Sequence, residues 1–230
     1  MVNINLRYLM EIKKDKEIEI KIPIPSDDVQ LEGTLYIPEN SQGLILFVHG
    51  SGSSRFSPRN RFVAQYLNKG AYSTLLFDLL TRSEETSDLI NASMRFDIDL
   101  LTRRLEETTD YVVSFPETKD CPLGYFGAST GAAAALIASV NRPGVKAVVS
   151  RGGRPDLASP YLSHVKVPSL LIVGGDDYPV IELNKRALES IVAPAKALEI
   201  VPGATHLFEE PGALNEVARL AVDWFIRYVH

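Results

Sequence analysis

Cysteine is almost absent from this sequence, since Cys121 is the only one among 230 residues. One thiol cannot form an internal disulfide, and it cannot build a zinc site from several thiolates. A sequence with so little cysteine is typical of a reducing compartment, so we expect a cytoplasmic location. We interpret Cys121, which stands between Asp120 and Pro122, as a small packing residue.

Long apolar stretches are also missing. The longest run, residues 132–140, contains Ser139 and is much shorter than the roughly 18 apolar residues of a membrane-spanning helix. The N-terminal segment MVNINLRYLMEIKKDKEIEI alternates charged and apolar residues and lacks the apolar core of a signal peptide. The sequence therefore predicts no membrane partner and no secretory leader.

Basic residues are not in excess, because 24 Lys and Arg stand against 29 Asp and Glu, which gives a formal charge of −5. Without a block of Lys and Arg the chain lacks the positive surface that contacts a phosphate backbone, so nucleic acid is not an expected partner. The composition, 45% hydrophobic and 23% charged, is that of a globular protein. At about 150 residues per domain, the length allows one large domain or two small ones.

The N-terminal part carries the pattern of an antiparallel hairpin. Residues 17–24 (EIEIKIPI) alternate polar and apolar side chains, and residues 31–37 (LEGTLYI) form a second strand candidate. Ser26, Asp27 and Asp28 lie between them and favour a turn. Because one face of such strands is polar, we place this hairpin at the edge of a sheet.

After about residue 43, short apolar runs alternate with helical patterns, which indicates βαβ units around a mostly parallel sheet. The expected buried strands are residues 44–48, 73–77, 124–126, 147–150, 169–173 and 198–201, and the expected helices are 59–68, 95–114, 130–140, 181–191 and 211–229. Two connections, 78–94 and 151–166, are longer than usual but too short for a cap domain. Without a repeat or linker, we expect one α/β domain over 1–230, with residues 1–27 as an N-terminal extension and edge strand.

A glycine-flanked serine provides the first candidate for catalysis. Ser129 lies in the motif Gly127-Ala-Ser129-Thr-Gly131, directly after an apolar run and directly before an alanine-rich helix pattern. In a sharp turn from strand to helix, small neighbours let a serine adopt a strained backbone that exposes its hydroxyl as a nucleophile. The alternative is that Ser129 or Thr130 caps the helix.

A serine nucleophile needs a base, and the base needs a carboxylate that orients it. After Ser129 the expected order is acid and then histidine, and His206 lies in a loop between the last strand and the last helix. His164 is interpreted as a solvated side chain. For the acid we choose Asp177 at the end of a buried strand, with Asp176 in reserve. A helix N-cap is the alternative role for either carboxylate.

The oxyanion of an acyl-transfer intermediate needs backbone N–H donors. The apolar strand 44–48 ends in His49-Gly50-Ser51-Gly52, a turn whose amides can point inward. We predict the N–H groups of Ser51 and Thr130 as donors and a structural role for His49. A phosphate-binding loop is the alternative, but no Gly-Lys-Ser/Thr follows.

Two arginines are candidates for binding substrate. Arg151 and Arg154 follow a predicted strand in SRGGRPD, where a guanidinium can hold a carboxylate or phosphate with two hydrogen bonds. Our hypothesis is that Arg151 gives a preference for anionic esters. The alternative is that one arginine pairs with Asp156 and braces the connection. Tyr161 is a candidate wall of a shallow substrate pocket or, alternatively, part of a dimer contact.

Taken together, these motifs resemble the α/β-hydrolase fold and, more narrowly, the dienelactone hydrolase-like group. The resemblance covers about residues 28–229 and includes HGSGSSRFSPRNRFVA, FGASTGAAAAL, SRGGRPDLA and PGATHLFEEPGAL. It implies a three-layer α/β-hydrolase fold with an eight-stranded, mostly parallel sheet and no cap domain. Some members of the group are fused to a phosphoribosyltransferase domain, which is not expected within these residues.

The resemblance implies a hydrolase that cleaves small carboxylic esters through an acyl-enzyme, with Ser129, Asp177 and His206 as triad and no cofactor or metal. Namesake enzymes carry cysteine where this chain has Ser129, which favours general ester hydrolysis over dienelactone. The same triad also serves thioesterases, peptidases and acyltransferases, and a non-catalytic binding protein is the further alternative. A small ester is the expected partner of a monomer or homodimer.

Overall fold

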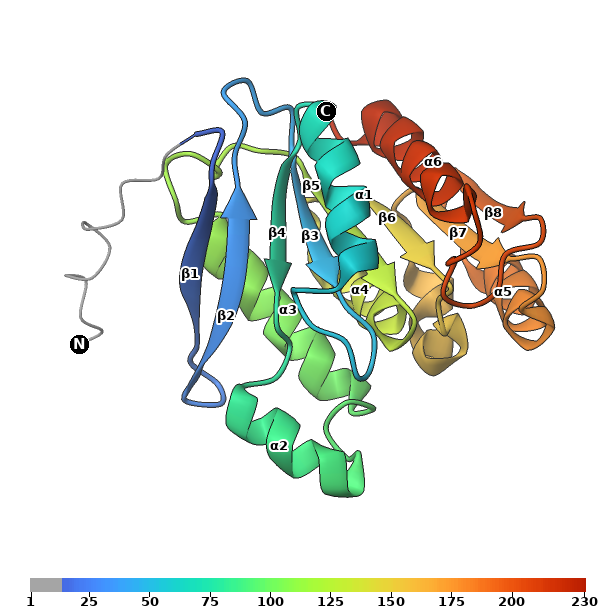
Figure 1. Ribbon diagram of the computed structural model, residues 1–230, viewed down its shortest axis with the longest axis horizontal. Coiled ribbons are helices and arrows are strands. Elements are labelled where there is room, and N and C mark those ends of the chain that lie inside the picture. Colours follow the sequence, from blue (N-terminus) through green and yellow to red (C-terminus); the bar gives the residue numbers. More distant parts are fainter. Residues whose placement is uncertain (1–13) are drawn as a thin grey trace.

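The computed structural model describes residues 14–230, which form one eight-stranded sheet with helices on both faces (Figure 1). The strands are β1 (Glu17–Ile24), β2 (Val29–Tyr36), β3 (Leu44–Val48), β4 (Ser73–Phe77), β5 (Leu123–Ala128), β6 (Val145–Arg151), β7 (Ser169–Gly174) and β8 (Lys196–Val201). Their order across the sheet is β1-β2-β4-β3-β5-β6-β7-β8. β2 pairs antiparallel with β1 and with β4, and the pairs from β4 to β8 are parallel.

The pattern of each strand reflects its place in the sheet. Every residue of β3, β4, β5 and β7 is buried, as expected for parallel strands that are covered on both faces. In β1, buried isoleucines alternate with more exposed residues, because only one face of this edge strand meets the core. The predicted hairpin and the mostly parallel α/β sheet are therefore confirmed.

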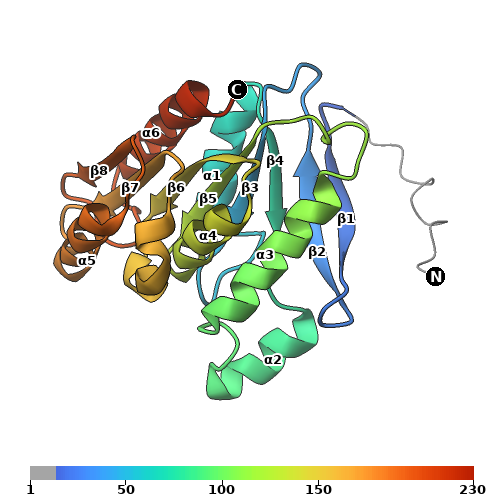
Figure 2. The same cartoon turned by 180° about the vertical axis from the view of Figure 1, so that it is seen from behind.

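The helices are α1 (Pro58–Lys69), α2 (Arg82–Asn91), α3 (Ile98–Val112), α4 (Thr130–Asn141), α5 (Tyr178–Ser190) and α6 (Ala213–Tyr228), together with the 3-10 segment η2 (Pro155–His164). α1 and α6 cover one face of the sheet, whereas α3, α4 and α5 cover the other (Figure 2). Each helical layer packs its own hydrophobic cluster against the sheet. This is the three-layer architecture expected from the sequence.

The two predicted long connections, 78–94 and 151–166, contain helices. α2 projects beyond the end of the sheet, and Asp88 is its only buried residue (Figure 1). It begins with a capping box in which Thr81 and Glu84 each accept a hydrogen bond from the other's backbone N–H. η2 contains Pro160 and follows no 3.6-residue apolar period. Both were missed because apolar periodicity does not define them.

Arg104 of α3 is hydrogen-bonded to three separate segments near α2, and its side chain is 1% exposed. Its guanidinium donates to Asp27 Oδ2 at 2.8 Å, to Glu84 Oε1 at 2.7 Å and to the Leu79 carbonyl at 2.8 Å. These acceptors belong to the hairpin turn, the start of α2 and the residues after β4. Two carboxylates and one carbonyl thus satisfy a buried charge.

Within residues 14–230, no helix has both the length and the apolar character needed to span a bilayer.

Candidate active site

The carboxyl ends of the parallel strands lie at one edge of the sheet, and the candidate residues follow them. Ser129 stands between β5 and α4 with φ 50° and ψ −122°, a strained backbone for a residue with a side chain. A Cβ on Gly131 would lie 2.2 Å from the Val48 carbonyl oxygen, and one on Gly127 would lie 2.5 Å from Ala132 Cα. The two glycines of the motif are therefore required for the turn to pack.

The Ser129 side chain does not cap α4, so the helix-cap alternative does not account for its hydroxyl. The first N–H groups of a helix have no intrahelical acceptor, and the helix dipole places partial positive charge there. Ser129 thus lies where negative charge on a reacting oxygen is stabilised.

Asp177 and His206 form the next pair. His206 Nδ1 lies 2.6 Å from Asp177 Oδ2, and the carboxylate is mostly buried whereas the imidazole is partly exposed. Asp177 precedes α5 but makes no side-chain cap hydrogen bond, and Asp176 is exposed. Of the two adjacent carboxylates it is therefore Asp177 that holds the histidine.

The loop after β6 brings this pair to Ser129. The Ser129 N–H donates to the Arg151 carbonyl at 3.2 Å, and the next residue is Gly152 with φ 53°. A Cβ on Gly152 would meet His206 Cε1 at 3.4 Å, so the imidazole packs directly against this glycine. Ser129 and His206 are thus neighbours of the same two-residue segment. Phe208, buried in the core with φ 56°, anchors the loop that carries the histidine.

The β3–α1 loop also lies against Ser129, because a Cβ on Gly50 would lie 2.8 Å from Ser129 Cβ. The Ser51 N–H donates to Thr130 Oγ1 at 2.9 Å. This donor is therefore already engaged, and it can serve an oxyanion only when that bond is exchanged. The N–H of Thr130 is at the first position of α4.

His49 has the structural role expected of it. Its Nε2 accepts from the Leu79 N–H at 3.0 Å, so Nδ1 carries the proton and donates to the Gly50 carbonyl at 2.9 Å. Burial lowers the pKa of His49, which keeps the ring neutral. The histidine thus joins the β3–α1 loop to the end of β4 without offering a free nitrogen for catalysis.

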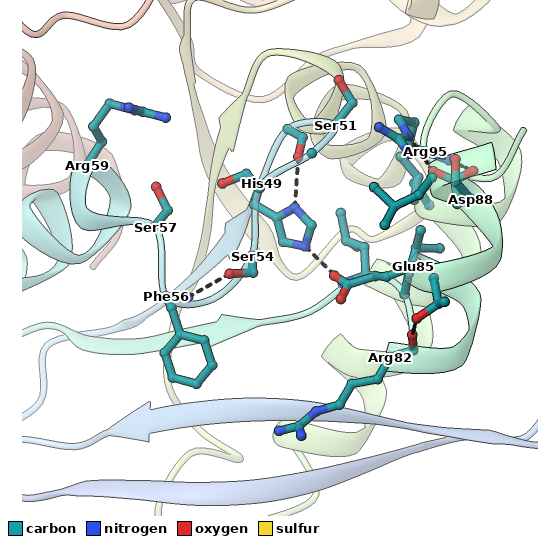
Figure 3. A pocket seen from close by; sticks show the side chains of 18 of the residues that line it. His49, Ser51, Ser54, Phe56, Ser57, Arg59, Arg82, Glu85, Asp88 and Arg95 are labelled. Atoms are coloured by element: carbon teal, nitrogen blue, oxygen red, sulfur yellow. Dashed lines mark hydrogen bonds and ion pairs between the residues drawn. The ribbon is translucent and has the colours of Figure 1, made fainter. Parts of the chain in front are cut away.

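A cavity of about 630 Å³ opens beside this loop (Figure 3). It is lined by residues 49–54, 56 and 57 of the loop, by Pro58 and Arg59 at the start of α1, by Leu79 and Leu80, by Arg82, Glu85, Thr86, Asp88 and Leu89 of α2, and by Arg95 and Leu101. The triad candidates do not line it, but Gly50 and Ser51 connect it to Ser129. The cavity therefore lies beside the loop that contacts Ser129, and it extends toward α2.

Charged side chains lie on two sides of this cavity. In Figure 3, Arg59 lies on the α1 side, whereas Arg82 and Glu85 lie on the α2 side. Burial and nearby Asp78 raise the pKa of Glu85. The buried Asp88 pairs with Arg95. No sequence motif indicated Glu85 as a lining residue, because α2 was not predicted.

The three predicted substrate-binding residues differ in their surroundings. Arg154 donates to both carboxylate oxygens of Asp156, at 2.8 and 2.7 Å, which is the bracing alternative from the sequence. Tyr161 lies on η2, is 38% exposed and does not line the cavity. Arg151 is buried and its guanidinium donates to Asn60 Oδ1 at 3.3 Å.

Among the described residues, 14–230, no group of three or more His, Cys, Asp and Glu side chains is arranged to hold a metal ion.

Comparison with known proteins identifies the family and the fold. Residues 31–228 match the model of the dienelactone hydrolase family. A solved dienelactone hydrolase from Anabaena variabilis ATCC 29413 is 53% identical, with a TM-score of 0.90 over 94% of this chain and 99% of that one. Est1E from Butyrivibrio proteoclasticus shares the fold, with a TM-score of 0.76 at 15% identity over 91% of this chain and 98% of its own.

A second relative is longer. A Mycobacterium tuberculosis H37Rv protein named "Putative phosphoribosyl transferase Rv0571c" is 52% identical over 219 residues, which is 94% of this chain and 47% of that protein. The same match is found in strain CDC 1551. The chain therefore spans about half the length of the curated relatives it matches.

Proposed function

Because the chain belongs to the dienelactone hydrolase family, we propose that it is a serine hydrolase that cleaves small carboxylic esters through an acyl-enzyme. The observation that carries this proposal is the 2.6 Å contact between His206 and Asp177 beside a serine whose hydroxyl does not cap its helix. A nucleophile, a base and an orienting acid are the minimum set for this chemistry.

In the proposed first step, Ser129 Oγ attacks the ester carbonyl carbon while His206 Nε2 takes the hydroxyl proton. Asp177 accepts the Nδ1 proton of His206 in a hydrogen bond, which fixes the tautomer and stabilises the imidazolium. The Thr130 N–H stabilises the carbonyl oxygen as it gains negative charge. The Ser51 N–H joins it when Thr130 Oγ1 releases that donor.

His206 then gives the proton to the leaving alcohol, and the acyl group stays on Ser129. Water attacks the acyl carbon in the second step, with His206 again as the base, and releases the carboxylic acid. The cavity of about 630 Å³ beside Ser51 suits a small acyl or alcohol group. Ser129 in place of the cysteine of the namesake enzymes favours ordinary esters over dienelactone.

The phosphoribosyl transfer named for the M. tuberculosis protein belongs to a chain of about twice this length, so we do not extend it to these residues. Thioesters and peptides remain alternative substrates for the same triad. With Cys121 as its only cysteine, the protein suits a reducing compartment, and we propose a cytoplasmic location.

Rapid mixing with an activated short-chain ester, such as a p-nitrophenyl acetate, tests the proposal. We expect a burst of about one equivalent of phenol per protein, followed by slower turnover, because acylation precedes deacylation. Ser129→Ala removes the burst and lowers kcat by about four to six orders of magnitude.

The matched control is Ser190→Ala, which deletes an exposed hydroxyl on α5 that donates to the Arg186 carbonyl. This variant keeps the burst. If wild-type protein and Ser129→Ala react equally slowly, the proposed function is wrong.

A further inference from the structure

Arg151 is a buried charge without a counter-ion. Its side chain is 6% exposed, and among residues 14–230 no carboxylate pairs with it. The guanidinium donates to Asn60 Oδ1 at 3.3 Å and lies 5.8 Å from the centre of the Phe208 ring, while Nε is buried without an acceptor. A buried charge of this kind destabilises the fold unless something else neutralises it.

A second guanidinium lies close by. Arg59, in the first turn of α1, borders the cavity and pairs at 3.0 Å with Glu209, a carboxylate that is 64% exposed. Arg59 Nε is also buried without an acceptor. Burial and the charge of Arg59 together lower the pKa of Arg151 to about 10, which leaves Arg151 positive at neutral pH. Of these two cations, only Arg59 has a carboxylate partner within residues 14–230, and that partner is largely exposed to solvent.

The amino end of α1 adds to this positive region. Ser57 caps the helix, Pro58 begins it, and its first turn contains no acidic residue. The helix dipole contributes about half a positive charge at this end. The two guanidinium charges, reduced by Glu209, thus leave about one and a half positive charges around the amino end of α1, whose residues Ser57, Pro58 and Arg59 line the cavity. Arg151 points into this region, since it donates to Asn60 in the first turn of α1.

We propose that Arg151, Arg59 and the amino end of α1 form a subsite for a phosphate monoester, and that the substrate is a small ester with a phosphate on its alcohol part. A phosphate monoester carries about −1.5 to −2 charges at pH 7, which matches the excess, whereas a carboxylate carries one. Its three acceptor oxygens also suit two planar guanidinium groups.

The subsite lies beside the nucleophile. The backbone carbonyl of Arg151 accepts the Ser129 N–H, and Phe208, against which the guanidinium lies, follows His206 in the same loop. A phosphate held here places the ester group of a short molecule at Ser129. This inference rests on the proposed function, because it names the substrate class of the same site.

Three acetate esters of one length, which end in a hydroxyl, a carboxylate or a phosphate, test the substrate class. We expect kcat/KM for the phosphate ester to exceed that for the neutral ester by about 10- to 100-fold, as for charge-assisted hydrogen bonds. If the carboxylate ester or the neutral ester reacts as well as the phosphate ester, the proposed subsite is wrong.

Arg151→Met and Arg59→Met test the residues. Each lowers kcat/KM for the phosphate ester at least about tenfold more than it lowers kcat/KM for the neutral ester. Arg151→Met keeps or raises the melting temperature, because it removes an unneutralised buried charge. Arg59 is more exposed and pairs with an exposed partner, so Arg59→Met tests the proposal even if Arg151→Met folds poorly.

The control is Arg142→Gln, which removes a guanidinium paired with Asp110 at the far end of α4. This variant leaves kcat/KM for both esters unchanged. If Arg151→Met and Arg59→Met lower kcat/KM for both esters equally, or if Arg151→Met only lowers the melting temperature, the arginines are structural and the inference fails.

A binding measurement separates this inference from the proposed function. Ser129→Ala binds inorganic phosphate in a calorimeter, and Arg151→Met weakens the binding, irrespective of any esterase activity. Binding without an acyl burst supports the subsite and rejects the proposed function. A burst without phosphate binding or phosphate selectivity rejects the subsite and supports the proposed function.

Discussion

Arg104 and Arg151 are both almost completely buried, at 1% and 6% exposure, but their surroundings are opposite. Arg104 donates to Asp27, to Glu84 and to the Leu79 carbonyl. Arg151 has one long hydrogen bond, to Asn60, and a buried Nε without an acceptor. Burial opposes the charge of both, yet the carboxylates of Glu84 and Asp27 raise the pKa of Arg104, whereas that of Arg151 falls to about 10.

The difference separates two uses of a buried charge. Around Arg104, carboxylates from the hairpin turn and α2 satisfy the guanidinium, so the network stabilises the fold. Near Ser129, the strained backbone at φ 50° and the unneutralised Arg151 lower stability, and such groups are expected where a substrate binds. Substitutions at the two places should therefore change different quantities.

The largest effect is expected on rate, at Asp177. Asp177→Asn keeps the contact to His206 but favours the wrong tautomer, so we expect kcat for an activated ester to fall about 10,000-fold, or about 5.5 kcal/mol. The free energy of unfolding should change little. Asp176→Asn, at the exposed neighbouring carboxylate, is the matched control in steady-state assays. A larger loss in Asp176→Asn would assign the acid role to that residue instead.

The second effect is on the free energy of unfolding, which is compared between variants of the two arginines. Arg104→Met leaves Asp27 and Glu84 without their shared partner, so urea unfolding should show a loss of about 3–5 kcal/mol. Arg151→Met should show no loss, because no carboxylate depends on Arg151. Equal losses in the two variants would remove the distinction between a structural and a ligand-binding arginine.

The smallest effect depends on pH. Although burial alone would raise them, hydrogen bonds from Arg104 lower the pKa values of Asp27 and Glu84. A folded-state pKa below the unfolded value stabilises the fold above the unfolded pKa of about 4, and that stability is lost as pH falls through the folded pKa.

The gap in unfolding free energy between wild type and Arg104→Met should therefore narrow by about 1 kcal/mol between pH 7 and pH 3.5. Urea titrations at pH 7, 5 and 3.5 measure it. A gap that stays constant or widens in acid contradicts the assigned network.

The strands and the turn at Ser129 could be predicted from the sequence because local residue patterns determine them. β3 and β4 were placed to the residue because their apolar runs are wholly buried, and the glycines around Ser129 marked the elbow because the turn leaves no room for side chains. α2 was not predicted because its residues are mostly polar, although Thr81 and Glu84 have the spacing of a capping box that marks its start.

Tertiary contacts were beyond sequence reasoning. Asp176 and Asp177 are adjacent acids, and only the position of the His206 loop distinguishes them. The sequence left Arg151 and Arg154 with the same two roles, but Asp156 pairs with Arg154 alone. The place of Arg59 next to Arg151 depends on how the first turn of α1 meets the end of β6, where Arg151 donates to Asn60.

Intact-protein mass spectrometry with a reactive organophosphonate ester, followed by peptide mapping, identifies the nucleophile directly. We expect one covalent adduct per chain, on the peptide that contains Ser129, and none in Ser129→Ala. No adduct, or an adduct on another residue that persists in Ser129→Ala, would contradict the assignment of Ser129 as the nucleophile.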